Sequence, residues 1–73
     1  MIISDHLEAY GKAIKQLRKF RQMTQQQLAD EAGLRMPTIS DIEAGKANFE
    51  INTLIRISAA LKCEIEITFT PLK

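Results

Sequence analysis

The stretch TQQQLADEAGLRMPTISDIEAG, residues 24–45, constrains the fold of this chain more than any other. Thr24 can cap a helix, because its hydroxyl can accept a hydrogen bond from the Gln27 amide while the Gln27 side chain returns to the Thr24 amide. Gly33 can end that helix, since glycine adopts the left-handed conformation needed there without steric cost. Pro37 suits the first turn of a second helix, where its missing N–H is not needed. The spacing therefore predicts a helix-turn-helix unit.

The apolar pattern predicts one mainly α domain over residues 1–73, with helices at residues 4–22, 25–32, 36–44 and 50–62. In the first helix, the residues expected to be buried are Leu7, Tyr10, Ile14 and Leu17. In the last helix, a wide apolar face consists of Ile51, Leu54, Ile55, Ile57, Ser58 and Leu61. A chain of this length buries a limited core, so oligomerisation is a reasonable additional source of stability.

Residues 63–70, CEIEITFT, change to a period of two. Ile65, Ile67 and Phe69 alternate with polar residues, which predicts a short β-strand with one apolar face, ended by Pro71. A single strand leaves backbone donors and acceptors without partners. We therefore expect this strand to pair antiparallel with the same strand of a second copy, its three apolar side chains facing the helices of the homodimer.

The sequence resembles the helix-turn-helix family of small bacterial and phage repressors, of the lambda and 434 kind, over about residues 8–62. The residues that carry the resemblance are Thr24, Gln25, Leu28, Ala29, Gly33, Leu34, Thr38, Ile39, Ser40, Ile42, Glu43, Gly45, Thr53 and Leu54. The resemblance implies a lambda-repressor-like four-helix domain, which binds double-stranded DNA as a homodimer at a palindromic operator and represses transcription. In that family the second helix of the motif enters the major groove.

The resemblance places base-reading residues at Arg35, Met36, Pro37, Ser40 and Asp41. The Arg35 guanidinium can donate two hydrogen bonds to guanine, or can instead bind a phosphate or remain a solvated loop side chain. Met36 can offer apolar contact to a thymine methyl, or can belong to the core or the dimer contact. Pro37 has no side-chain donor where 434-type proteins have a glutamine. Asp41 could accept a hydrogen bond from cytosine, or could reject other sequences by repulsion.

Phosphate contacts are expected at Gln25, Gln26, Thr38, Lys46 and Asn48. Gln25 lies at the start of the first motif helix, where the partial positive charge of the helix favours an anion. Such contacts position a protein on DNA without reading its sequence.

Basic residues gather in the first helix although the net charge is only +1; they are Lys12, Lys15, Arg18, Lys19 and Arg21. A cluster of this kind suits binding to a polyanion, and is also typical of a solvated helix face. The resemblance sets Arg18 apart, because the family pairs this position with Glu43 in a partly buried structural salt bridge.

The strand that follows the helices directly, and the stretch SDHLEAYGKAIKQLRKFRQMTQQQLA, are similar to HipB-type antitoxins, whose C-terminal strands pair across the dimer. This resemblance implies a protein toxin as partner, a HipA-like kinase, in a type II toxin–antitoxin pair. The alternatives are a phage-type or free-standing regulator without a toxin, and an antitoxin for another class of toxin.

Catalysis is not expected of this chain. His6 has no second residue at metal-ligand or catalytic-triad spacing, and Cys63 alone forms neither an internal disulfide nor a cysteine zinc cluster. There is no glycine-rich phosphate loop, and no apolar stretch approaches the ~20 residues of a membrane span. The first residues are too short for a signal peptide. We expect a cytoplasmic protein that needs no cofactor, metal or small-molecule ligand.

Overall fold

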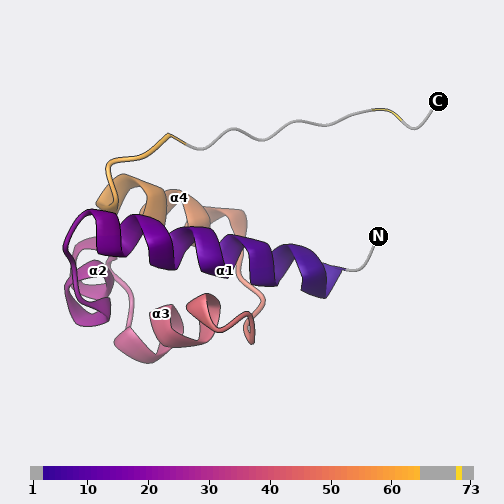
Figure 1. The fold of residues 1–73 in the computed structure, drawn as a ribbon, viewed down its shortest axis with the longest axis horizontal. Coiled ribbons are helices and arrows are strands. Elements are labelled where there is room, and N and C mark those ends of the chain that lie inside the picture. The colour runs from indigo at the N-terminus through magenta and orange to yellow at the C-terminus, as the bar shows by residue number, and fades with distance from the viewer. Residues whose placement is uncertain (1–2, 65–70, 72–73) are drawn as a thin grey trace.

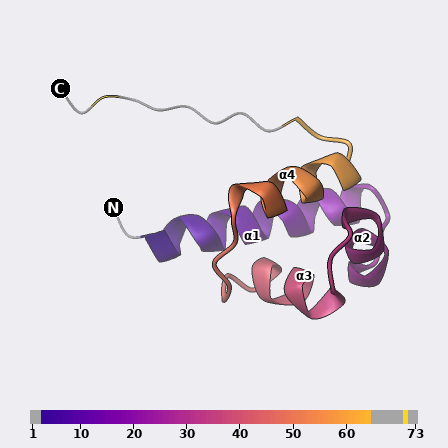
Figure 2. The same ribbon diagram turned by 180° about the vertical axis from the view of Figure 1, so that it is seen from behind.

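The computed structural model describes residues 3–64 and Pro71, with side chains from Leu7 onward. Its helices are α1 (Ile3–Phe20), α2 (Gln25–Ala32), α3 (Met36–Glu43) and α4 (Ile51–Ala60). Helix α1 lies between α4 and α3, and α2 lies near the C-terminal end of α1 (Figures 1 and 2). Helix α3 packs on both α1 and α2, and α2 also packs on α4.

The hydrophobic core is built mainly from the helix-turn-helix itself. Helices α2 and α3 supply most of its buried side chains, α1 supplies one and α4 closes it; the core residues are Ile14, Leu28, Ala29, Ala32, Ile39, Ile42, Ile57 and Leu61. This arrangement fixes the inward face of α3 and turns its other face to solvent.

All four helices of the described part of the chain end in the same hydrogen-bonding pattern. The residues just past the helices, Gln22, Gly33, Gly45 and Lys62, have positive φ angles between 56° and 73°. Each donates its N–H to the carbonyl three residues back, and the next residue donates to the carbonyl five residues back. This is the Schellman motif. Gln22 and Lys62 adopt the left-handed conformation of this motif although neither is glycine. For this reason α1 and α4 each end two residues earlier than we expected.

Of the four residues expected to be buried in α1, Ile14 is buried and Leu7 is half-buried, but the expectation is wrong for Tyr10 and Leu17. Tyr10 is 47% exposed and Leu17 is 36% exposed. Gly11 and Arg18, which lie outside that apolar stripe, are buried beside Ile14. An apolar pattern does not find this face, because one of its members is a glycine and another is a charged residue.

Gly11 is buried because α1 and α3 approach closely at this point. A Cβ atom on Gly11 would overlap the carbonyl oxygen of Ile42 and would lie 3.0 Å from that of Glu43. Glycine therefore allows the backbone of α1 to rest directly on the last turn of α3.

The expected apolar face of α4 is too wide. Ile57 and Leu61 are buried, but Ile51 and Ile55 are 57% and 51% exposed. Cys63 and Glu64 have no regular secondary structure, and residues 65–70, where most of the strand is expected, lie outside the described residues. The strand and its pairing stay a prediction.

Candidate nucleic-acid interface

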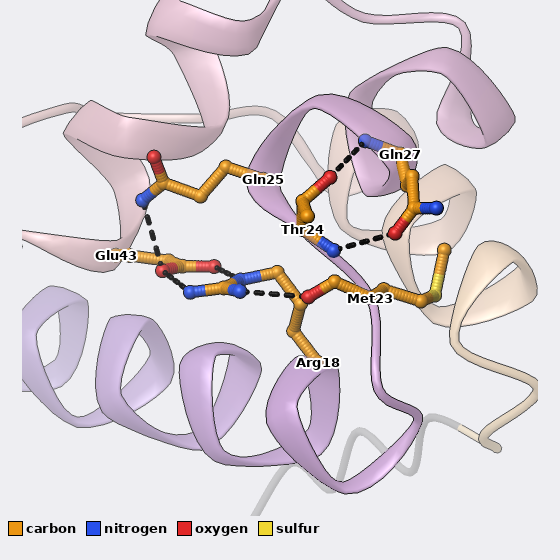
Figure 3. Close-up of polar contacts among 6 residues, drawn as sticks. All are labelled: Arg18, Met23, Thr24, Gln25, Gln27 and Glu43. Atoms are coloured by element: carbon orange, nitrogen blue, oxygen red, sulfur yellow. Dashed lines mark hydrogen bonds and ion pairs between the residues drawn. The ribbon is translucent and has the colours of Figure 1, made fainter.

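Helices α2 and α3 and the turn between them form the predicted helix-turn-helix. Thr24 Oγ1 accepts a hydrogen bond from the Gln27 amide at 3.0 Å, and Gln27 Oε1 accepts one from the Thr24 amide at 2.8 Å (Figure 3). Gly33 ends α2 in the left-handed conformation, with φ 70° and ψ 34°. Pro37 lies in the first turn of α3. The capping box, the glycine turn and the position of the proline are confirmed.

An ion pair joins α1 to the last turn of α3. Arg18 Nε lies 2.6 Å from Glu43 Oε2, and a second guanidinium nitrogen donates to Glu43 Oε1 at 3.0 Å. A third nitrogen donates to the Met23 carbonyl at 2.8 Å (Figure 3). The hydrogen bonds to Glu43 raise the pKa of Arg18 above its ordinary value. Arg18 and Glu43 side chains are only 10% and 3% exposed, so the pair is structural rather than a surface contact.

The same carboxylate holds the first residue of α2. Gln25 Nε2 donates to Glu43 Oε1 at 3.1 Å, so Glu43 receives hydrogen bonds from both Gln25 and Arg18 (Figure 3). One Nε2 hydrogen of Gln25 is therefore used inside the protein, and the other is left for an outside acceptor. The network fixes the N-terminus of α2 relative to the C-terminus of α3.

The outward face of α3 contains the expected base-reading residues. Arg35, Met36, Pro37 and Asp41 are exposed, and Ser40 is half-buried. Arg35 precedes α3 with an extended backbone and makes no side-chain cap. Among the described residues, its guanidinium has no hydrogen bond or ion pair. All five side chains are therefore at least partly accessible to solvent.

The expected phosphate-contact residues lie at three places. Gln25 and Gln26 begin α2, Thr38 is half-buried in α3, and Lys46 and Asn48 are exposed in the loop after α3. The Gln26 amide donates to Asp30 Oδ1 at 2.8 Å, along its own helix. Both glutamine amides thus have partners within the protein, which the sequence did not indicate.

A family model described as "Helix-turn-helix" matches residues 14–67. The chain belongs to this family. The Immunity repressor protein of Bacillus phage phi105 is 38% identical over 55 residues, which cover 75% of this chain and 38% of that repressor. The chain thus spans well under half the length of this relative. The HTH-type transcriptional regulator y4mF of Sinorhizobium fredii is 33% identical over 57 residues, 78% of this chain and 75% of that protein.

The fold also matches a solved structure of a regulator. The crystal structure of the restriction-modification controller protein C.AhdI from Aeromonas hydrophila superposes with a TM-score of 0.80 at 25% identity, over 82% of this chain and 91% of that chain. These matches identify the chain as a DNA-binding helix-turn-helix regulator and not an enzyme.

The structure divides the basic residues of this helix-turn-helix protein into two groups. Arg18 is committed to Glu43, and Arg21 donates to the Leu61 carbonyl at 2.9 Å and to the Lys62 carbonyl at 3.2 Å. The lysines of α1 are exposed. Two of the five clustered cations are therefore structural. The spacing of residues in the sequence does not indicate that Arg21 binds backbone carbonyls, because its partners lie 40 and 41 residues away in the chain.

Among the side chains that the structure describes from Leu7 to Glu64, no group of His, Cys, Asp and Glu could hold a metal ion. None of the described helices is long and apolar enough to cross a membrane.

Proposed function

We propose that this chain is a sequence-specific DNA-binding repressor that works as a homodimer. The observation that carries the proposal is the exposed face of α3, with an unpaired Arg35 at its start. The opposite face of α3 is locked by Ile39, Ile42 and the Arg18–Glu43 pair. A helix that is rigidly held from behind and solvent-exposed in front suits insertion into the major groove.

In this proposal Arg35 donates two hydrogen bonds to guanine O6 and N7, the commonest specific contact in DNA complexes. Met36, Ser40 and Asp41 face neighbouring base edges, and Pro37 contributes shape only. Gln25, held by Glu43, offers its second amide hydrogen to a phosphate. The remaining phosphate contacts of the proposal are made by Gln26, Thr38, Lys46 and Asn48.

Homodimerisation is part of the proposal, because a palindromic operator needs two copies of α3. The period-two pattern of residues 65–69 supports an antiparallel ribbon across the two-fold axis. Exposed apolar side chains on α1 and α4 add support, since a monomer rarely exposes a large contiguous apolar patch. Sedimentation at micromolar concentration tests this point, and a strictly monomeric chain would contradict it.

Between the two biological settings, the free-standing or phage-type regulator is favoured over the antitoxin. The relatives described above are an immunity repressor, a transcriptional regulator and a controller protein, and none of their names mentions a toxin. The setting is tested by co-expressing the chain with the proteins encoded beside it. We expect no stable complex, and a co-purifying kinase would restore the HipB-type antitoxin proposal.

Selection from a library of random DNA duplexes tests the function itself. The recovered sequences should contain an inverted repeat whose half-site centres lie about 34 Å apart, or a multiple of that distance. Footprinting on the recovered site should then give symmetric protection. Recovery of no common sequence, or protection of a single unsymmetric half-site, would contradict the proposal.

A further inference from the structure

The Gln25 side chain is held in one orientation by a buried acceptor. Its Nε2 donates to Glu43 Oε1 at 3.1 Å, while its carbonyl oxygen points away from the carboxylate (Figure 3). Exchanging the amide nitrogen and oxygen would set two acceptors against each other, so the carboxylate permits one orientation of the amide. Gln25 is half-buried, which leaves part of this oriented amide accessible to a ligand from solution.

Glu43 acts on this amide from inside the protein. Its side chain is only 3% exposed, so it can influence DNA through Gln25 but is screened from direct contact. Arg18 donates to both carboxylate oxygens, at 2.6 Å to Oε2 and at 3.0 Å to Oε1, in the bidentate geometry that fixes a carboxylate. The positive charge of Arg18 also balances Glu43, so a phosphate held by Gln25 does not meet an uncompensated negative charge.

Gln26, the next residue, provides a direct comparison. Its amide donates to Asp30 Oδ1 at 2.8 Å, and both side chains are exposed. A hydrogen bond between residues four apart on an exposed helix face is weak, because water competes for both partners. Of the two glutamines expected to bind phosphate, Gln25 is therefore the one that is anchored to the interior of the fold.

We infer that Glu43, held by Arg18, is a positioning residue for DNA binding. In the free protein it orients Gln25 so that the second Nε2 hydrogen is available to a backbone phosphate. An unrestrained side chain of this kind loses rotamer freedom when it binds, which lowers affinity about fivefold. Here the ordering takes place during folding instead. The inference rests on the proposed function, and it makes the ion pair a determinant of DNA affinity as well as of stability.

Methylphosphonate scanning of the selected operator tests the inference. Each duplex carries one uncharged substitute for a phosphate, so the loss of affinity reports the contacts made at that position. Wild type should lose about tenfold where Gln25 binds, because a hydrogen bond to a charged group is weakened there. Gln25→Ala should lose this sensitivity at one phosphate per half-site, which identifies the position.

The deciding protein is the double variant Arg18→Met, Glu43→Leu, which removes one charge of each sign and leaves the net charge at +1. At the phosphate identified with Gln25→Ala, its loss of affinity should be only about twofold, because Gln25 is no longer oriented. At the other phosphates its losses should equal those of wild type. The matched control Asp30→Ala releases Gln26 instead, and should keep the wild-type loss at the Gln25 phosphate. Circular dichroism checks that the helix content is unchanged.

A wild-type loss at the Gln25 phosphate in the double variant would overturn the inference and leave the proposed function intact. If Gln25→Ala changes the sensitivity at no phosphate, the inference falls with that contact, while symmetric protection of the operator would still support sequence-specific binding.

Nuclear magnetic resonance relaxation of the wild-type protein gives a test that does not depend on the folding of the double variant. The Gln25 side-chain amide should be as rigid as the backbone of α2, and the Gln26 amide should be more mobile. Equal mobility of the two side-chain amides would overturn the inference.

Discussion

Replacing Arg18 with methionine should remove a large part of the stability of this domain. The change deletes two hydrogen bonds to Glu43 and one to the Met23 carbonyl. Glu43, whose side chain is 3% exposed, would keep only the Gln25 amide as a partner. Stranding one member of a buried pair costs about 3–5 kcal/mol. A domain of 73 residues has a total stability of about 4–11 kcal/mol.

The double variant Arg18→Met, Glu43→Leu should regain most of that loss, because an apolar pair needs no charge compensation. Replacing a complete buried pair with apolar residues is often neutral or stabilising. The coupling energy of the double-mutant cycle should therefore be at least about 3 kcal/mol. Urea unfolding followed by circular dichroism measures all four proteins, and Arg56→Met, at an exposed arginine of α4, serves as the control.

Two results would contradict a structural role for the Arg18–Glu43 pair. The first is a cost of less than about 1 kcal/mol for Arg18→Met, which is what an exposed ion pair contributes. The second is a double variant as unstable as the sum of the two single variants.

Because hydrogen bonds to Glu43 raise the pKa of Arg18, the guanidinium stays charged, and the contribution of the ion pair to stability should persist through neutral and moderately alkaline pH.

Three further predictions follow from the packing and the charges. Gly11→Ala should destabilise the fold by about 1–3 kcal/mol, because the new Cβ atom meets the Ile42 carbonyl and this outweighs the better helix propensity of alanine. Urea unfolding measures the change, and a gain in stability would contradict the close approach of α1 to α3. Lys62→Gly should raise the free energy of unfolding by up to about 1 kcal/mol, because glycine adopts the left-handed conformation without strain. Arg21 still donates to the backbone carbonyl of residue 62 in this variant. Thermal unfolding measures the change, and a lower stability would contradict the prediction. Operator affinity measured by fluorescence anisotropy should fall steeply with salt, because phosphate contacts release counterions, and a salt-independent constant would contradict the proposed phosphate contacts.

The helix-turn-helix was predictable because its signals are local. A capping box, a left-handed glycine and a proline in the first turn each act within a few residues. The structure contains all three. Helix ends were less predictable, because Gln22 and Lys62 adopt a conformation that favours glycine.

The inward face of α1 could not be found from apolar periodicity. Gly11 is buried by close backbone approach, and Arg18 by a partner 25 residues away. Both depend on where α3 lies, and an apolar pattern carries no such information. The resemblance to repressors supplied the Arg18 pairing, whereas the roles of Arg21 and of the Gln25 amide required the three-dimensional arrangement.

In the proposed complex α3 reads DNA sequence through Arg35, and a binding experiment can distinguish this role from a phosphate contact. Fluorescence anisotropy should compare wild type, Arg35→Ala, Lys46→Ala and the control Arg56→Ala on the selected operator and on a scrambled duplex. Arg35→Ala should lose about 1–3 kcal/mol of operator affinity and little on the scrambled duplex. Lys46→Ala should lose affinity for both, and Arg56→Ala for neither. If Arg35→Ala instead weakens binding to both duplexes equally, Arg35 contacts phosphate and does not read the base sequence.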